Sequence, residues 1–193
     1  YGSAFFDKHA EFKDGDTHVF LQKLAKDNNA YVVGGSIIVK MKDKLFNTCF
    51  VFDRKGNEIG SYSKIHLFDI DLPKKKFKES DTLSPGNKPL ILCTDFGHVG
   101  IGICFDLRFS KLAEFYRENN CSIIVYPGAF TMPTGKLHYE LLLRGRALDN
   151  QLYVIGCAPS RDETASYVTW SNSTVVNPFG EVILNLGHKQ NSA

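Results

Sequence analysis

The sequence predicts one α/β domain in which helices cover β-sheets. Its 193 residues, 43% hydrophobic and 23% charged, have the composition of a single globular domain with a sizeable core. Short apolar runs alternate with segments of helical periodicity in the second half, a pattern typical of buried strands covered by helices. No internal repeat or linker interrupts the chain, so we expect residues 1–193 to form a single domain.

The first half begins with a helix, because apolar residues recur at helical spacing between Asp16 and Asn28 and Asp16-Thr17 can cap its start. Strands are expected at 31–39, 46–52 and near 58–63, the last two joined in a hairpin by Arg54–Asn57. Residues 66–86 contain two prolines and many charges without a sustained period, which predicts a long loop of functional importance.

The second half alternates strands with helices. Strands are expected near 90–94, 99–105, 121–126 and 152–158, helices at 110–119 and 137–150, and two strands within 173–186 joined at Asn177-Pro178-Phe179-Gly180.

Composition excludes several classes of protein. A net charge of +2 with scattered basic residues argues against nucleic-acid binding, and no apolar run is long enough to span a membrane. The five cysteines are odd in number and form no CxxC pattern, which favours reduced thiols and a cytoplasmic location. The chain begins Tyr1-Gly2-Ser3 without a Met, so a mitochondrial or other targeting segment upstream stays open.

Cys104 is the first candidate for chemistry. It follows the apolar run 99–103 and precedes a helix, so it is expected at the carboxyl edge of a sheet, where α/β proteins place their sites. Cations and helix-terminus amides at such an edge lower the pKa of a thiol. A buried core cysteine is an equally good reading of the position alone. Lys64, Glu79 and Glu140 are, taken singly, ordinary surface residues.

Taken together, these segments resemble the nitrilase-like carbon–nitrogen hydrolase superfamily, and within it the omega-amidase branch. The resemblance covers essentially the whole chain and rests on segments 62–71, 79–80, 83–86, 100–109, 126–130 and 146–150. It implies a four-layer α-β-β-α sandwich, a homodimer or larger homo-oligomer, and a Glu-Lys-Cys triad that uses no metal or organic cofactor.

The resemblance also assigns roles. Cys104 matches the nucleophile, and Lys64 matches the lysine that stabilises the oxyanion with the backbone N–H of Phe105. Glu79 matches a second glutamate that positions the lysine or the substrate. Arg108 matches the residue that receives a substrate carboxylate through its planar fork. Residues from Tyr126 to Phe130 are expected to line the pocket.

The ends depart from the family pattern. The family's general-base glutamate lies on an early strand just before a segment that resembles Tyr1-Gly2-Ser3, and neither Asp7 nor Glu11 matches it. Members also continue beyond the strand near 182–186. We therefore expect a domain truncated at both ends, and inactive as this fragment alone.

The implied reaction is hydrolysis of the terminal amide of small dicarboxylic acid monoamides, releasing ammonia through a thioester. Another carbon–nitrogen hydrolase activity, on aliphatic amides or N-carbamoyl amines, is an alternative, as is a non-catalytic relative acting as a binding subunit. A metal site at His66, Asp69 and Asp71 lacks a complete ligand set. A protease-like pairing of Cys104 with His66 or His138 leaves Lys64 unexplained.

Overall fold

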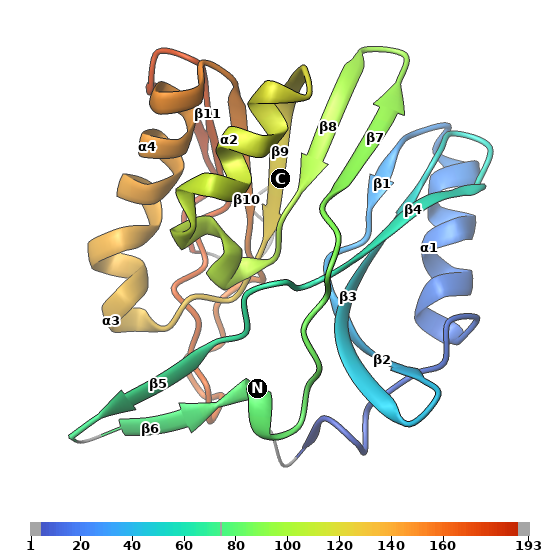
Figure 1. The fold of residues 1–193 in the computed structure, drawn as a ribbon, viewed down its shortest axis with the longest axis vertical. Coiled ribbons are helices and arrows are strands. Elements are labelled where there is room, and N and C mark those ends of the chain that lie inside the picture. Colours follow the sequence, from blue (N-terminus) through green and yellow to red (C-terminus); the bar gives the residue numbers. More distant parts are fainter. Residues whose placement is uncertain (1–4, 74, 189–193) are drawn as a thin grey trace. The chain divides into compact units, whose positions relative to one another are not determined.

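The computed structural model describes residues 5–73 and 75–188, and the chain divides into two compact units, Tyr1–Leu90 and Ile91–Ala193. Each unit contains a β-sheet with helix packed on a face (Figure 1). The predicted α/β class is therefore confirmed at the level of each unit.

The sheet of the first unit is built around a long strand, β3 (Lys44–Phe52). Strand β4 (Glu58–Ser63) pairs antiparallel along one edge, forming the predicted hairpin. Along the other edge run β1 (Val32–Val33) and then β2 (Ile37–Met41). The single strand expected at 31–39 is interrupted there. Between the pairs Val33–Val51 and Ile37–Thr48, this edge has three residues where β3 has two, a bulge in which Gly35 adopts a positive φ of 68°.

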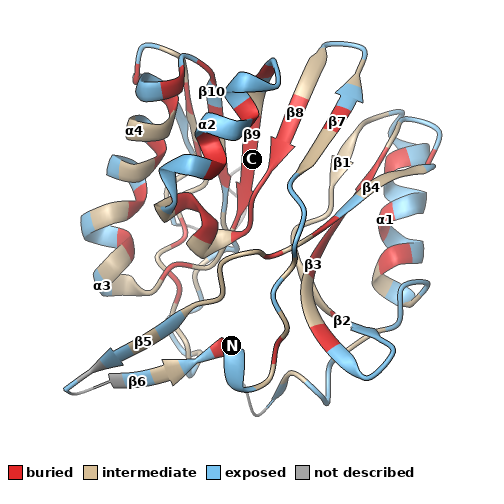
Figure 2. Ribbon diagram, viewed as in Figure 1, coloured by how far each residue is buried: buried red, intermediate tan, exposed pale blue. Residues whose placement is uncertain are grey.

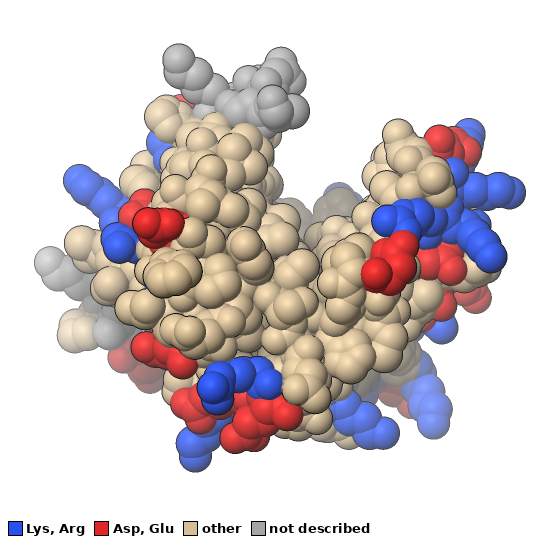
Figure 3. All heavy atoms as spheres, turned by 90° about the horizontal axis from the view of Figure 1, so that it is seen from above, with Lys and Arg blue, Asp and Glu red and all other residues tan. Residues whose placement is uncertain are grey.

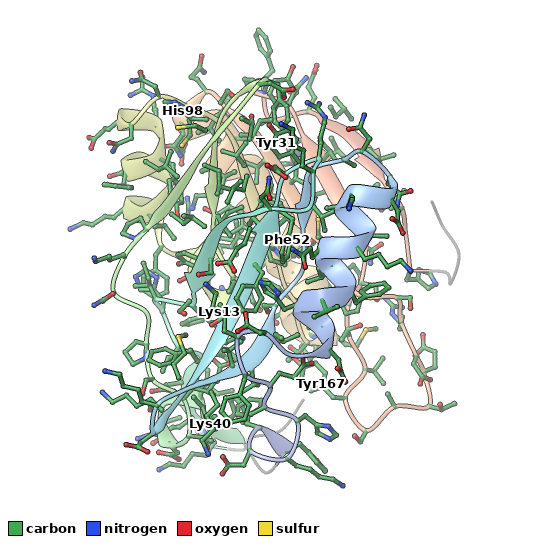
Figure 4. All side chains as sticks on the ribbon, turned by 90° about the vertical axis from the view of Figure 1, so that its right-hand side faces the viewer. Lys13, Tyr31, Lys40, Phe52, His98 and Tyr167 are labelled. Atoms are coloured by element: carbon green, nitrogen blue, oxygen red, sulfur yellow. The ribbon has the colours of Figure 1, made fainter. Side chains whose placement is uncertain are left out.

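Helix α1 (Asp16–Asp27) covers this sheet through a stripe of buried residues, His18, Leu21 and Ala25, at helical spacing. Leu21 and Ala25 pack with Val39, Phe50 and Phe52 of the sheet, and this face of α1 is buried in Figure 2. Figure 4 shows Phe52 on the sheet beside α1. The first unit thus has its own apolar core.

The predicted cap of α1 is wrong in detail. The N-cap residue is Gly15, and no side-chain cap comes from it. Instead the carboxylate of Glu11 accepts hydrogen bonds from the backbone N–H of Thr17, at 2.9 Å, and from the Thr17 hydroxyl. An acidic group near the N-terminus of a helix is stabilising, so Glu11 has a structural role here.

Residues 66–86 form more structure than the expected loop. Strands β5 (Asp69–Leu72) and β6 (Lys75–Lys78) make an antiparallel hairpin, followed by the short 3₁₀ turn η2 (Glu79–Asp81). Opposite charges face each other across it, since Asp69 pairs in register with Lys78, and Asp71 forms an ion pair with Lys76. Cross-strand pairing of charges, rather than an apolar period, explains why the hairpin was missed.

The second unit is built on a six-stranded sheet in the order β12-β11-β10-β9-β8-β7. Strands β8, β9 and β10 are parallel, and β11 and β12 continue antiparallel. Their bounds are β7 Leu90–Thr94, β8 Gly97–Ile101, β9 Cys121–Pro127, β10 Tyr153–Cys157, β11 Thr174–Val176 and β12 Val182–Asn185. All six predicted strands of this half are confirmed, although β8 ends before Cys104.

Helices α2 (Ser110–Glu118) and α4 (Glu140–Asn150) pack on β9 and β10 and contact each other, so they cover one face of this sheet (Figure 1). The helix expected to begin at Leu137 starts earlier, with α3 (Met132–Thr134) and a π-helical turn, η4 (Gly135–Tyr139). A π turn within a helix often marks a functional position.

The outer surface carries both signs of charge. On the face drawn in Figure 3, Lys and Arg side chains lie among Asp and Glu side chains, which fits the net charge of +2. Of the helices in the described parts of the chain, none has the length and apolar character to cross a membrane.

Candidate active site

Cys104 lies just beyond the carboxyl end of β8, as predicted. It opens the 3₁₀ turn η3 (Cys104–Arg108), which leads into α2. Its φ is 49°, in the left-handed region that a residue with a Cβ adopts at a cost of about 1–2 kcal/mol. Such strain at a strand-to-helix turn is characteristic of a nucleophile held out from a sheet edge.

Two charged side chains hold this turn in place. The buried Asp106 carboxylate accepts a hydrogen bond of 2.9 Å from the backbone N–H of Ile103, one residue before the cysteine. From α4, Arg146 donates through Nε to the carbonyl oxygen of Leu107 at 3.1 Å, and through Nη2 to that of Arg108 at 3.2 Å. Charge-assisted hydrogen bonds of this kind are stronger than neutral ones and fix the backbone conformation.

The end of β9 lies directly against the cysteine. A Cβ added at Gly128 would be 2.8 Å from the Cys104 Cα, so only glycine permits this approach. Tyr126 is 1% exposed, and its ring contacts Gly102 so closely that a Cβ there would be 2.4 Å from Cε1. Tyr126 therefore packs behind the turn, and its assignment to the pocket lining stays a prediction. Burial raises the pKa of Tyr126.

Arg108 ends the turn and lies beside two aromatic rings. Its guanidinium carbon is 5.8 Å from the ring centroid of Phe105 and 5.7 Å from that of Phe130. Its Nη2 is 3.1 Å from Nδ1 of His138. Burial lowers the pKa of Arg108, and electrostatic interaction with Cys104 opposes that shift. The guanidinium thus lies within electrostatic range of the nucleophile candidate while remaining a cation at neutral pH.

Lys64 and Glu79 come together in the first unit. The Lys64 ammonium is 2.6 Å from Oε2 of Glu79, and the same oxygen accepts the backbone N–H of Phe68 at 2.8 Å. Lys64 is 2% exposed and Glu79 is 8% exposed. A buried ion pair is weak evidence for stability, because desolvation offsets the attraction, so its presence favours a functional role.

The backbone around Lys64 is fixed on both sides. Its N–H donates to the carbonyl oxygen of Asn47 on β3, and its carbonyl oxygen accepts from Gly86 N–H, both at 2.8 Å. A Cβ at Gly86 would lie 2.0 Å from the carbonyl oxygen of Ser63, so this crossing requires glycine. The sheet edge and the segment after η2 therefore determine where the lysine points.

The other polar candidates have local partners. Asp69 accepts hydrogen bonds from the backbone N–H and the hydroxyl of Ser80, which lower the pKa of Asp69 against the effect of its desolvation. Glu140 is an exposed residue 3.9 Å from Arg144. Within residues 5–73 and 75–188, no group of three or more His, Cys, Asp and Glu side chains is arranged to hold a metal ion.

Cys121 differs from Cys104 because its side chain is buried. Burial raises the pKa of Cys121 to about 11, so Cys121 remains a thiol at neutral pH. None of the five cysteines forms a disulfide in the described chain.

Sequence reasoning did not assign roles to three residues that support the site: Asp106, Arg146 and His138. Asp106 and Arg146 lie within segments 100–109 and 146–150, which carry the family resemblance. Their place in these segments is the sequence feature that could have marked them as site residues. For His138 the sequence suggests only a protease-like base, since nothing in the sequence links it to Arg108.

The comparison with known families agrees with this geometry. The carbon–nitrogen hydrolase model matches residues 3–192, and the chain belongs to that family. Omega-amidase NIT2 of Bos taurus is 50% identical over 191 residues, covering 98% of this chain and 69% of the bovine protein. Omega-amidase NIT2 of Homo sapiens is 48% identical over the same coverage.

A solved structure supports the fold. Saccharomyces cerevisiae Nit3, described as a member of branch 10 of the nitrilase superfamily, superposes with a TM-score of 0.88 at 36% identity. The comparison covers 97% of this chain and 68% of the yeast chain. The predicted family and fold type are therefore confirmed.

Proposed function

We propose that this protein hydrolyses the terminal amide of small dicarboxylic acid monoamides, releasing ammonia through a thioester on Cys104. The observation that supports this substrate class is Arg108. In the described chain no carboxylate forms an ion pair with this half-buried guanidinium, which lies over two phenylalanine rings. A desolvated cation in that setting gains most from an anionic ligand. The high identity to two omega-amidases supports the same class.

The proposed reaction has two halves. The Cys104 thiolate attacks the amide carbonyl, and the oxyanion is stabilised by Lys64 and the Phe105 N–H. The carbon–nitrogen bond then breaks, ammonia leaves with an added proton, and a thioester remains. Water attacks the thioester, the carbon–sulfur bond breaks, and a carboxylate and the thiolate are formed. Glu79 holds the Lys64 ammonium throughout.

Proton transfer in both halves requires a base. The family resemblance gives this role to a glutamate that no residue of this sequence matches. Glu11 is already engaged by Thr17 at the start of α1.

A panel of amides tests the proposed function. We expect ammonia release from 2-oxoglutaramate with a kcat/KM at least about 10-fold above that for butyramide or an N-carbamoyl amine, because a carboxylate bound to Arg108 contributes a charge-assisted hydrogen bond. Ammonia is measured by a coupled assay. Faster turnover of the neutral amide or the N-carbamoyl amine would assign another branch, and release from none of them would favour a non-catalytic binding subunit.

We also propose that the protein forms a homodimer or larger homo-oligomer through α4. Leu137, Leu141 and Leu148 are 66%, 69% and 53% exposed along this helix and the turn before it. The β11–β12 turn lies beside them, because Arg144 Nε donates to the Gly180 carbonyl oxygen at 2.7 Å, and Phe179 in that turn is 82% exposed. Contiguous apolar surface of this kind marks an interface.

Light scattering on a sizing column tests the interface. Leu141→Glu with Leu148→Glu is expected to shift the protein to a smaller species, because two charges would be buried in an apolar contact. Phe20→Glu is the control, since Phe20 is similarly exposed, at 61%, but lies on α1. An unchanged mass in the double variant would refute the assignment.

For location, we propose the cytoplasm, with a mitochondrial location as the alternative. Five cysteines without a disulfide in the described chain, one of them the proposed nucleophile, are compatible with a reducing compartment.

A further inference from the structure

His138 is linked to Arg108 by a hydrogen bond whose direction is fixed by chemistry. The distance from Arg108 Nη2 to His138 Nδ1 is 3.1 Å. A guanidinium has donors only, so Nδ1 is the acceptor, and the proton of the neutral imidazole is on Nε2. The imidazole therefore accepts a hydrogen bond from one edge of the guanidinium, at Nη2.

The two phenylalanine rings contact the guanidinium in a different way. Phe105 and Phe130 lie 5.8 and 5.7 Å from the guanidinium carbon, with the cation over each ring. Rings in this position attract the cation but supply no hydrogen-bond acceptor in the plane of its N–H groups. The hydrogen bond from Nη2 to His138 supplies such an acceptor at one edge and sets where the remaining N–H groups point.

His138 is itself held in a rigid setting. It belongs to the π turn η4 between α3 and α4. A Cβ at Gly135 would lie 2.1 Å from the Trp170 Cβ, so the start of η4 is packed directly on that residue. The next residue, Tyr139, is 2% exposed and its ring meets that of Phe130 edge-on at 5.1 Å. The imidazole thus projects from backbone that is packed on both sides.

We propose that His138 is a positioning residue that orients Arg108 for a substrate carboxylate, and so sets the preference for anionic over neutral amides. This inference rests on the proposed function, because it gives Arg108 the role of carboxylate receptor. With the edge beside His138 occupied, the other N–H groups of the fork are presented together, as bidentate binding of a carboxylate requires.

Three variants of the full-length protein test this role. His138→Ala removes the acceptor. His138→Asn retains a polar acceptor at about the position of Nδ1. Lys136→Ala is the matched control, since Lys136 is an exposed residue of the same turn. The kinetic readout is the ratio of kcat/KM for 2-oxoglutaramate to that for butyramide.

We expect His138→Ala to lower this ratio about 10-fold through a higher KM for 2-oxoglutaramate, the effect typical of losing one hydrogen bond to a charged group. His138→Asn is expected to recover most of the ratio, and Lys136→Ala to match the parent. Equal losses on both substrates, or an asparagine variant as defective as the alanine variant, would overturn the role of His138.

A binding measurement separates this inference from the proposed function. In a Cys104→Ala background, calorimetry with 2-oxoglutarate should show a Kd about 10-fold weaker when His138→Ala is added. If the parent releases no ammonia from any amide, the proposed function fails, and the calorimetry still decides the role of His138. An unchanged Kd would refute the positioning role even in an active enzyme.

Discussion

Cys104→Ser is expected to lower ammonia release from 2-oxoglutaramate by at least about 10³-fold while leaving the protein folded. The proposed thioester requires a thiolate, and a serine hydroxyl in the same place stays protonated at neutral pH. Serine keeps the size of the side chain and the left-handed turn, so the thermal unfolding midpoint should change little. Single-turnover mass spectrometry of the parent should also detect an acyl adduct on the peptide containing Cys104.

The control for this variant is Cys93→Ser, since Cys93 is an exposed cysteine on β7. It is expected to keep parental activity. Retained activity in Cys104→Ser, or an acyl adduct on another cysteine, would disprove the assignment of the nucleophile.

Lys64→Met is expected to have two separate effects. It removes the ammonium proposed to stabilise the oxyanion, which should lower kcat by about 10²–10³-fold. It also leaves the Glu79 carboxylate, 8% exposed, with the Phe68 N–H but without its ion-pair partner. Breaking a buried pair by removing one partner costs about 3–5 kcal/mol, so the free energy of unfolding in urea should fall by that order.

The double variant Lys64→Met with Glu79→Gln separates the two effects. A neutral amide at position 79 removes the uncompensated charge while still accepting the Phe68 N–H, so most of the stability should return. Activity should not return. If the double variant regained activity together with stability, Lys64 would be a structural residue only.

Sequence predicted the second unit better than the first, and the reason is physical. Its parallel strands β8, β9 and β10 are apolar because helices cover them, so a run such as 121–126 is readable from hydrophobicity alone. The hairpin β5–β6 is held by pairs such as Asp71–Lys76, which have no hydrophobic period, and it was expected to be a loop. The bulge between β1 and β2 depends on register with β3, which sequence does not contain.

Some residues of the candidate site could be predicted from the sequence, and some of its contacts could not. Cys104 and Lys64 were predicted from the family resemblance, because each lies in a contiguous motif, whereas position alone left Cys104 open and did not favour Lys64. The contact of His138 with Arg108 joins residues 30 positions apart. It also depends on the π turn that contains His138, and no local sequence pattern predicts that turn. Similarly, the hydrogen bond between Glu11 and Thr17 depends on the three-dimensional path of the chain before α1, which no motif in the sequence indicates.

The left-handed conformation of Cys104 also bears on how such a protein changes over time. A glycine in that position would relieve the backbone strain, since glycine adopts a positive φ without steric penalty. Selection for a more stable fold and selection for chemistry therefore act in opposite directions on one codon. A lineage that stopped depending on amide hydrolysis would be expected to lose its thiol early, well before the Asp106 and Arg146 contacts that shape the turn.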